Sequence, residues 1–225
     1  MWVGAFLKKE MFFMKLGDIK IEALKLMFVS EETEFHADIL EELMLDEEYR
    51  IYLANMPGAI NRCFAAIEEK RILPSRCYAP DLNEGVESGL HWRFDLGRIP
   101  QFGKLDRVVR ESEYGGYDPS CSYQREETVL VLPRLASYEH YKILYKPQIP
   151  RITLGTDNNT ELEIPENIAV HIPLYIKGDL YRDDEPGEAA EARNWFEAAM
   201  NELARGADTA GHQTSVRSIY SMEVD

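Results

Sequence analysis

Basic residues and cysteines are both scarce in this chain. Its 225 residues include 25 lysines and arginines against 40 aspartates and glutamates, which gives a net charge of −15 at pH 7. Clustered lysines and arginines make the contacts to nucleic-acid phosphates, so this balance argues against a broad nucleic-acid-binding face. The cysteines, Cys63, Cys77 and Cys121, have no close partners in sequence. This spacing argues against a disulfide framework or a zinc site and predicts reduced thiols.

Long apolar runs are absent as well. No run approaches the length that a membrane-spanning helix requires, and the N-terminal stretch lacks a basic region followed by a long apolar one. We therefore expect a protein that is neither exported nor associated with a membrane. The first thirteen residues match nothing that follows in pattern, and Lys8, Lys9 and Glu10 could be encoded by a purine-rich ribosome-binding sequence. We hypothesise that the natural start is Met14.

Common catalytic and cofactor motifs are missing too. The sequence has no glycine-rich phosphate loop with a lysine, no HExxH and no GxSxG, and its five histidines are isolated from one another. Residues 157–163 place oxygen-bearing side chains at alternate positions, but they lack the glycine that an EF-hand turn needs. We interpret them as a polar turn that caps the following helix. The sequence thus predicts no enzyme, no cofactor and no metal site.

A predicted pair of helices over residues 165–205 organises the rest of the chain. Pro165 suits the first turn of a helix, because the missing N–H would be unsatisfied there. Acidic residues and Pro186 begin the second helix, and Gly206 is expected to end it. The short turn between the helices predicts an antiparallel pair. Pro173 falls inside the first helix, where we expect a kink.

The N-terminal part, residues 14–75, is predicted to be mostly helical. Apolar residues at helical spacing indicate one helix from Asp18 and another over residues 31–45. The pattern is interrupted at residues 55–58 and restarts there, since Pro57 is tolerated in a first turn. The buried face of this third helix is expected to carry Ile60, Cys63, Phe64 and Ile67.

Residues 77–164 change from a helical to an alternating apolar pattern. β-branched and aromatic residues are separated by Gly, Pro, Asn and Asp, which is typical of strands and turns. The predicted strands are residues 91–96, 104–110, 128–132, 138–145 and 151–154. Helices, then strands, then helices indicate an α+β fold. We expect a single domain in which N- and C-terminal helices form a bundle with an inserted antiparallel β-sheet or small sandwich.

The last twenty residues, 206–225, are small and polar until three apolar residues near the end. One interpretation is a flexible tail. The other is an arm whose apolar end orders when it docks on a neighbouring subunit or partner. The candidate partner-docking residues of this arm are Val216, Ile219 and Tyr220.

The segment from residue 161 to 203 resembles the C-terminal helical pair of the head-to-tail connector (adaptor, or tail-tube-A-like) proteins of tailed bacteriophages. The resemblance rests on Pro165, on the Leu-Tyr-acidic step at 180–184, and on the Ala-Arg-rich helix with aromatic residues at 192–196. The N-terminal helix at 57–70, followed by strands and further helices, is similar to the same family's layout. The first thirteen residues depart from it.

This resemblance implies a structural virion protein that is made in the bacterial host cytoplasm. Its subunits are expected to form a ring between the portal and the tail, with DNA passing transiently through the channel. The implied partners are other copies of the chain and the portal and tail proteins. The family's functional surfaces are contacts and not fixed motifs, so the resemblance assigns no site residues.

Two alternatives from other classes remain open. A small-molecule or carbohydrate binding module could use an aromatic face of the sheet, formed by His91, Trp92, Tyr138, Tyr141 and Tyr145. A hydrolase has less support, because no nucleophile and base can be paired from the sequence.

Overall fold

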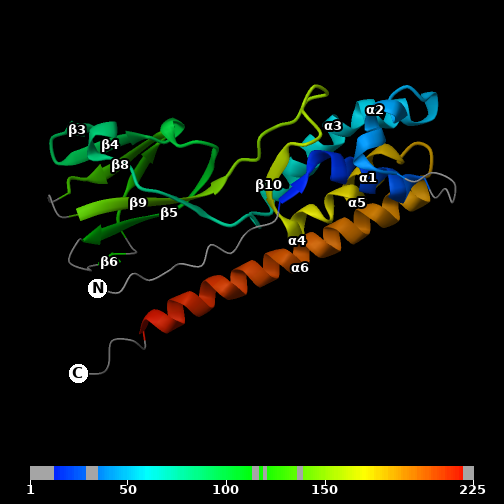
Figure 1. Ribbon diagram of the computed structural model, residues 1–225. Coiled ribbons are helices and arrows are strands. Elements are labelled where there is room, and N and C mark those ends of the chain that lie inside the picture. Colours follow the sequence, from blue (N-terminus) through cyan, green and yellow to red (C-terminus); the bar gives the residue numbers. More distant parts are fainter. Residues whose placement is uncertain (1–12, 29–34, 113–116, 119–120, 136–138, 220–225) are drawn as a thin grey trace, which may run out of the picture. The chain divides into compact units, whose positions relative to one another are not determined.

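The computed structural model describes residues 13–28, 35–112, 117–118, 121–135 and 139–219 (Figure 1). The fold is α+β with antiparallel sheets, as the sequence predicts. The chain divides into two compact units. The helical unit combines the two ends of the chain, Met1–Ile72 and Arg151–Asp225, and the sheet unit is Leu73–Pro150. The inserted β-rich region therefore ends earlier than the predicted range 77–164.

The helical unit contains a short two-stranded ribbon together with all the α-helices that the structure describes. In chain order its elements are β1 (Phe13–Lys15), α1 (Leu16–Met27), η1 (Ala37–Ile39), α2 (Leu40–Leu43), α3 (Glu47–Glu69), β10 (Glu161–Pro165), α4 (Glu166–Ala169), α5 (Ile172–Leu180) and α6 (Pro186–Ile219). β1 and β10 pair antiparallel, with Phe13 opposite Pro165 and Lys15 opposite Glu161. This pairing brings the start of α1 close to the turn that precedes β10, where the Leu16 N–H donates a 2.9 Å hydrogen bond to the carbonyl oxygen of Thr160.

α5 lies at the centre of this unit and contacts α1, α3 and α6. The ring of Tyr175 meets the ring of Phe196 edge-on, with 5.0 Å between the centroids. Nearer the start of α5, His171 and Ala199 line a shared cavity, while nearer its end Gly178 lies against Ala189. The start of α5 thus lies beside a later part of α6, and the end of α5 lies beside the start of α6. The two helices are antiparallel, as their short connection predicts.

Two prolines affect their helices in ways that differ from the sequence prediction. α3 runs unbroken from Glu47 to Glu69 with Pro57 inside it, so the helix restart expected at residues 55–58 is wrong. Pro57 removes one backbone hydrogen bond, but it is itself buried on the same face as Met56 and Ile60, and this packing offsets the loss. At Pro173 the helix is broken and not merely kinked. α4 ends at Ala169, and Pro173 lies in the first turn of α5.

Two further helix predictions need correction. The helix expected over residues 31–45 is reduced to the short η1 and α2, and residues 29–34 lie outside the described part. α6 does not end at Gly206 but continues to Ile219, because an interior glycine costs a helix only about 1 kcal/mol. Residues 206–219, expected to be a flexible tail, are therefore helical.

The sheet unit contains two four-stranded antiparallel sheets. Its strands are β2 (Arg76–Tyr78), β3 (Val86–Ser88), β4 (His91–Asp95), β5 (Phe102–Ser112), β6 (Tyr117–Asp118), β7 (Gln124–Glu126), β8 (Val129–Pro133) and β9 (Glu139–Pro147). The sheet orders are β2-β9-β5-β6 and β3-β4-β8-β7. Four predicted strands correspond to β4, β5, β8 and β9, whereas residues 151–154 form no strand.

The two sheets share one aromatic core. Trp92 and Phe94 of β4 are buried together with Tyr141 and Ile143 of β9. The indole of Trp92 stacks on the ring of Tyr141, with 5.9 Å between the centroids. Tyr141 also donates a hydrogen bond of 2.6 Å from its hydroxyl to the carbonyl oxygen of Pro133. The sheet unit is thus a small sandwich.

Gly178 allows α5 and α6 to approach closely. A Cβ atom at this position would lie 3.0 Å from the carbonyl oxygen of Ala189. We predict that Gly178→Leu forces the helices apart and lowers the free energy of unfolding by about 1–3 kcal/mol. Gly187→Leu is the matched control, because a Cβ there would meet nothing within 4 Å. Urea unfolding followed by far-UV circular dichroism measures both variants, and equal losses would contradict this packing.

Candidate partner-binding groove

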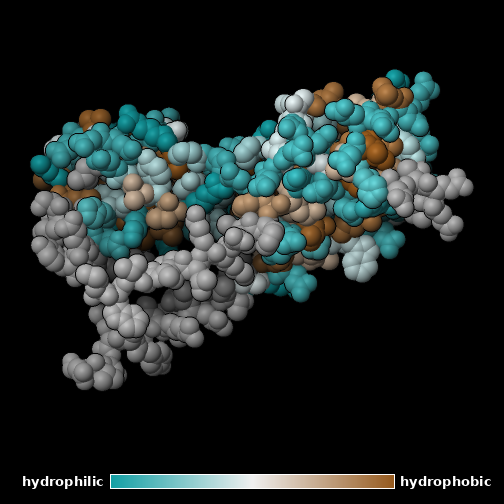
Figure 2. All heavy atoms as spheres, viewed as in Figure 1, coloured by the Kyte–Doolittle hydropathy of each residue, from teal (hydrophilic) through white to brown (hydrophobic). Residues whose placement is uncertain are grey.

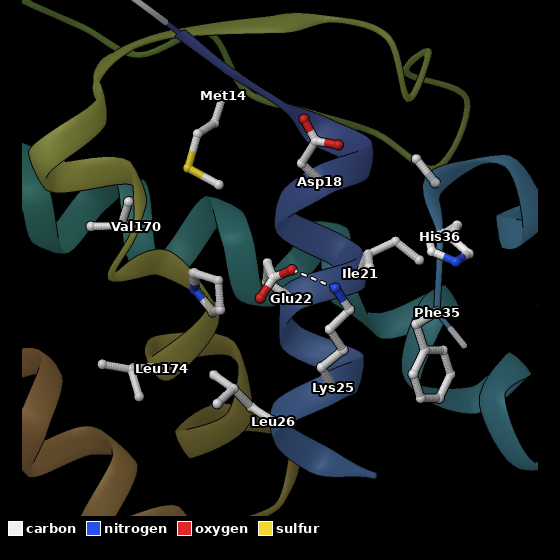
Figure 3. A pocket seen from close by; sticks show the side chains of 12 residues that line it. Met14, Asp18, Ile21, Glu22, Lys25, Leu26, Phe35, His36, Val170 and Leu174 are labelled. Atoms are coloured by element: carbon white, nitrogen blue, oxygen red, sulfur yellow. Dashed lines mark hydrogen bonds and ion pairs between the residues drawn. The ribbon is translucent and has the colours of Figure 1, made fainter. Parts of the chain in front are cut away.

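A groove opens on the helical unit between α1, residues 35–37 and the first turn of α5 (Figure 3). It has a volume of about 660 Å³. The apolar side chains that line it include Met14, Ile21, Leu26, Phe35, Val170 and Leu174. We call this feature the α1–α5 groove. Its lining comes from segments about 150 residues apart in sequence, which α5 brings together by packing on α1.

Apolar side chains of the groove are left in contact with water. Val170 is 47% exposed and Leu26 is 36% exposed, although Ile21 and Phe35 beside them are buried. In Figure 2 the visible face of the helical unit likewise shows brown apolar residues among teal hydrophilic ones. Covering such side chains contributes roughly 25 cal/mol for each Å² of apolar surface removed from water. The groove is therefore suited to an apolar partner.

The polar residues of the groove are two carboxylates, one lysine and one histidine. Asp18 lies in the first turn of α1, where the helix dipole favours a carboxylate. Glu22 forms an ion pair of 2.8 Å with Lys25 one turn further on, and Figure 3 shows both beside the apolar side chains. Asp18 makes no ion pair with any residue that the structure describes. An incoming cation would find a partner at this end of the groove.

The Leu-Tyr-acidic segment at residues 180–184, which connects α5 to α6, has a structural role. Tyr181 donates a hydrogen bond from its hydroxyl to the backbone carbonyl of Met27, at the end of α1. Asp184 accepts a hydrogen bond of 2.8 Å from the hydroxyl of Tyr52 in α3. The rings of Tyr52 and Tyr181 also lie side by side, with 5.7 Å between the centroids. These contacts fix the point at which α6 begins.

α6 presents an exposed tryptophan. Trp195 is 63% exposed, whereas its neighbour Phe196 is buried against α5. Adjacent residues of a helix point about 100° apart, and here Phe196 faces α5 while Trp195 faces solvent. The sequence analysis did not identify Trp195 as an exposed aromatic residue. The apolar lining of the α1–α5 groove gave no local signal in the sequence.

The three predicted docking residues are only partly within the described chain. Val216 and Ile219 fall in the last turns of α6. Tyr220 lies just outside the described residues. The docking role of these three residues stays a prediction.

The polar turn at residues 157–159 holds the start of α1. The carbonyl oxygen of Asn158 accepts a 2.8 Å hydrogen bond from the Gly17 N–H, and its side-chain oxygen accepts one of 2.8 Å from Lys20 Nζ. The turn leads into β10, so the expectation that it caps a following helix is wrong. Within the described ranges, no group of three or more His, Cys, Asp or Glu residues is arranged to hold a metal ion.

The aromatic platform considered for a binding module is inside the sheet unit. Trp92, Tyr141 and Tyr145 are all buried in its core. Tyr138 lies outside the described residues, and His91 is exposed at the start of β4. These three buried rings are consequently closed to a sugar or other ligand.

Comparison with known proteins adds no relative. No protein-family model matches the chain, and no curated protein matches it in sequence. No helix in the described part of the chain is both long and apolar enough to cross a membrane.

Ionisation of Tyr52 should link the stability of the helical unit to alkaline pH. Burial, followed by the hydrogen bond to Asp184, raises the pKa of Tyr52 to about 12 from its ordinary value of 10.0. The stabilisation is fully present below pH 10 and is lost between pH 10 and 12, because the unfolded chain releases this proton first. Tyr52→Phe should cost about 1–3 kcal/mol at pH 8, since it removes a hydrogen bond to a carboxylate.

The difference in unfolding free energy between the wild type and Tyr52→Phe should therefore shrink as the pH rises from 10 toward 12. Urea titrations at a series of pH values measure it. Tyr123→Phe changes an exposed tyrosine of the sheet unit and should leave the pH profile unaltered. If the difference in unfolding free energy stays constant from pH 8 to 12, the assigned stabilising hydrogen bond from Tyr52 to Asp184 is contradicted.

Proposed function

We propose that this chain is a structural virion component, the head-to-tail connector (adaptor) of a tailed bacteriophage or prophage. Its copies form a ring between the portal and the tail, and DNA passes through the channel during packaging and ejection. In this proposal the N- and C-terminal helices form the rigid bundle of each subunit, and the inserted sheet unit is a surface for the tail. The protein works by contacts and is not an enzyme.

The observation that carries the proposal is the length of α6 relative to the core that it covers. Among the side chains described on α6, the buried ones are Ala189, Ala192, Phe196 and Met200. The helix continues from Met200 to Ile219, about 19 residues and roughly 28 Å at ~1.5 Å per residue. In this proposal, contacts with a neighbouring copy pack the far part of this extension.

The composition of the extension supports a role for a partner. Short isolated helices are marginal in water, because nucleation is costly and most stability comes from packing. Residues 207–219 contain several weak helix formers, among them Thr209, Gly211, Thr214, Ser215 and Ser218. In the proposed ring, a neighbouring subunit supplies packing for this segment.

The acidic character of the chain also suits a DNA channel. A net charge of −15 repels phosphates and so disfavours a tight grip on DNA. A passage for DNA needs this property, since a basic wall would hold the duplex by releasing its counterions.

Trp195 should act in the contact between subunits. Exposed tryptophans that become buried at interfaces commonly contribute 2 kcal/mol or more to binding, about a 30-fold change in affinity. We predict that Trp195→Ser weakens self-association of the purified chain, or its binding to a portal ring, by about 30-fold. Leu90→Ser is the control, because it removes an apolar residue of the β3–β4 hairpin that is 81% exposed.

Multi-angle light scattering with and without a purified portal ring from the same phage measures these effects and tests the proposal. Rings, or a monomer that joins the portal, are expected for the wild type. A monomer indifferent to the portal would contradict the proposal. A stable two-fold dimer would also contradict it, because such a dimer buries the same patch on both copies and does not extend into a ring.

A further inference from the structure

Building on the proposed ring, we propose that the α1–α5 groove of one subunit binds the C-terminal end of α6, residues 216–220, from a second copy of the chain. The occupant is a segment with three apolar residues and one basic residue, and the site is an apolar groove that also carries Asp18, Glu22 and Lys25. The contact is therefore between two different surfaces of the same protein.

The groove supplies an apolar surface that nothing in the described chain covers. Val170 and Leu26 keep large exposed fractions there, although both stand beside buried core residues. A groove of about 660 Å³ has room for a few side chains projecting from a helix. Recognition of an amphipathic helix through residues spaced three and four apart is a common use of such grooves.

The end of the chain has the matching pattern. Val216, Ile219 and Tyr220 are spaced three and four residues apart in sequence, which is the spacing of residues that share one face of a helix. Arg217 is the one lysine or arginine among the last twenty residues. Since the chain as a whole carries a net charge of −15, a basic residue beside this apolar face is a distinctive feature. Asp18 at the groove provides a carboxylate for it, whereas Glu22 is paired with Lys25.

A subunit cannot fill its own groove with this segment. The antiparallel α5–α6 packing brings α6 past the start of α5 near Ala199, where that residue shares a cavity with His171. From there α6 continues for about 20 residues, roughly 30 Å, before Ile219. Figure 1 shows α6 as one unbroken helix, so it does not turn back toward Val170 and Leu174. The segment that enters the groove must come from another copy.

Cysteine cross-linking between two different proteins tests this contact directly. Both proteins are full-length and carry Cys77→Ser, which removes the exposed cysteine, while Cys63 and Cys121 stay buried. The first protein also carries Val170→Cys. The second protein carries a tag and Ile219→Cys. A disulfide needs Cα atoms within about 7 Å, so only close neighbours can link. Mixing the two under diamide should give a mixed dimer at a yield at least tenfold above that of the Leu90→Cys control protein.

A charge exchange tests the polar part of the same contact. Asp18→Arg and Arg217→Asp should each weaken association by about fivefold, as an exposed ion pair allows, and the double exchange should restore it to within about twofold. Glu41→Arg is the control, since it makes the same change at an exposed position of α2. Circular dichroism of each variant verifies that the fold is retained.

The outcomes separate this inference from the proposed function. Rings that form without the mixed cross-link, and without rescue by the charge exchange, would overturn the groove contact and leave the connector standing. Cross-linking that is lost when a portal is added would assign the groove to the portal and overturn a subunit–subunit contact. A chain that stays monomeric under all conditions would overturn both.

Discussion

The packing of α5 against α1, α3 and α6 is the constraint on which the helical unit depends. Asp179 of α5 accepts a 3.2 Å hydrogen bond from Arg62 Nε in α3, and its other carboxylate oxygen lies 3.6 Å from Arg193 Nη2 in α6. The guanidinium of Arg193 also lies over the ring of Tyr175, 4.0 Å from its centroid. A nine-residue helix thereby fixes the directions of two much longer ones.

The direction of α6 then determines what the chain can offer to other molecules. Its start is fixed by Tyr181 and Asp184, and its first half is held against α5 by Phe196, whose ring meets that of Tyr175. The remaining half leads away from the core that it covers. In our proposal this geometry carries one end of each subunit to the groove of the next, and a repeated contact between unlike surfaces closes into a ring.

The sequence predicted those features that depend on local patterns. The strands β4, β5, β8 and β9 follow apolar alternation, and the α5–α6 pair follows from capping signals and a short turn. Features decided by distant contacts were missed. Pro57 remains helical because its neighbours are buried by other elements, and β10 forms because β1 from the far end of the chain pairs with it. The α1–α5 groove combines Leu26 with Val170, and no local pattern connects two residues so far apart.

The central claim is that copies of this chain associate head to tail in a closed ring. Negative-stain electron microscopy of the full-length protein together with its portal tests this claim most directly, because class averages show the symmetry of the assembly. Our account predicts averages with a cyclic axis, a central channel and an added layer beneath the portal. Portal rings without that layer, beside free monomers or two-fold dimers of this chain, would contradict it.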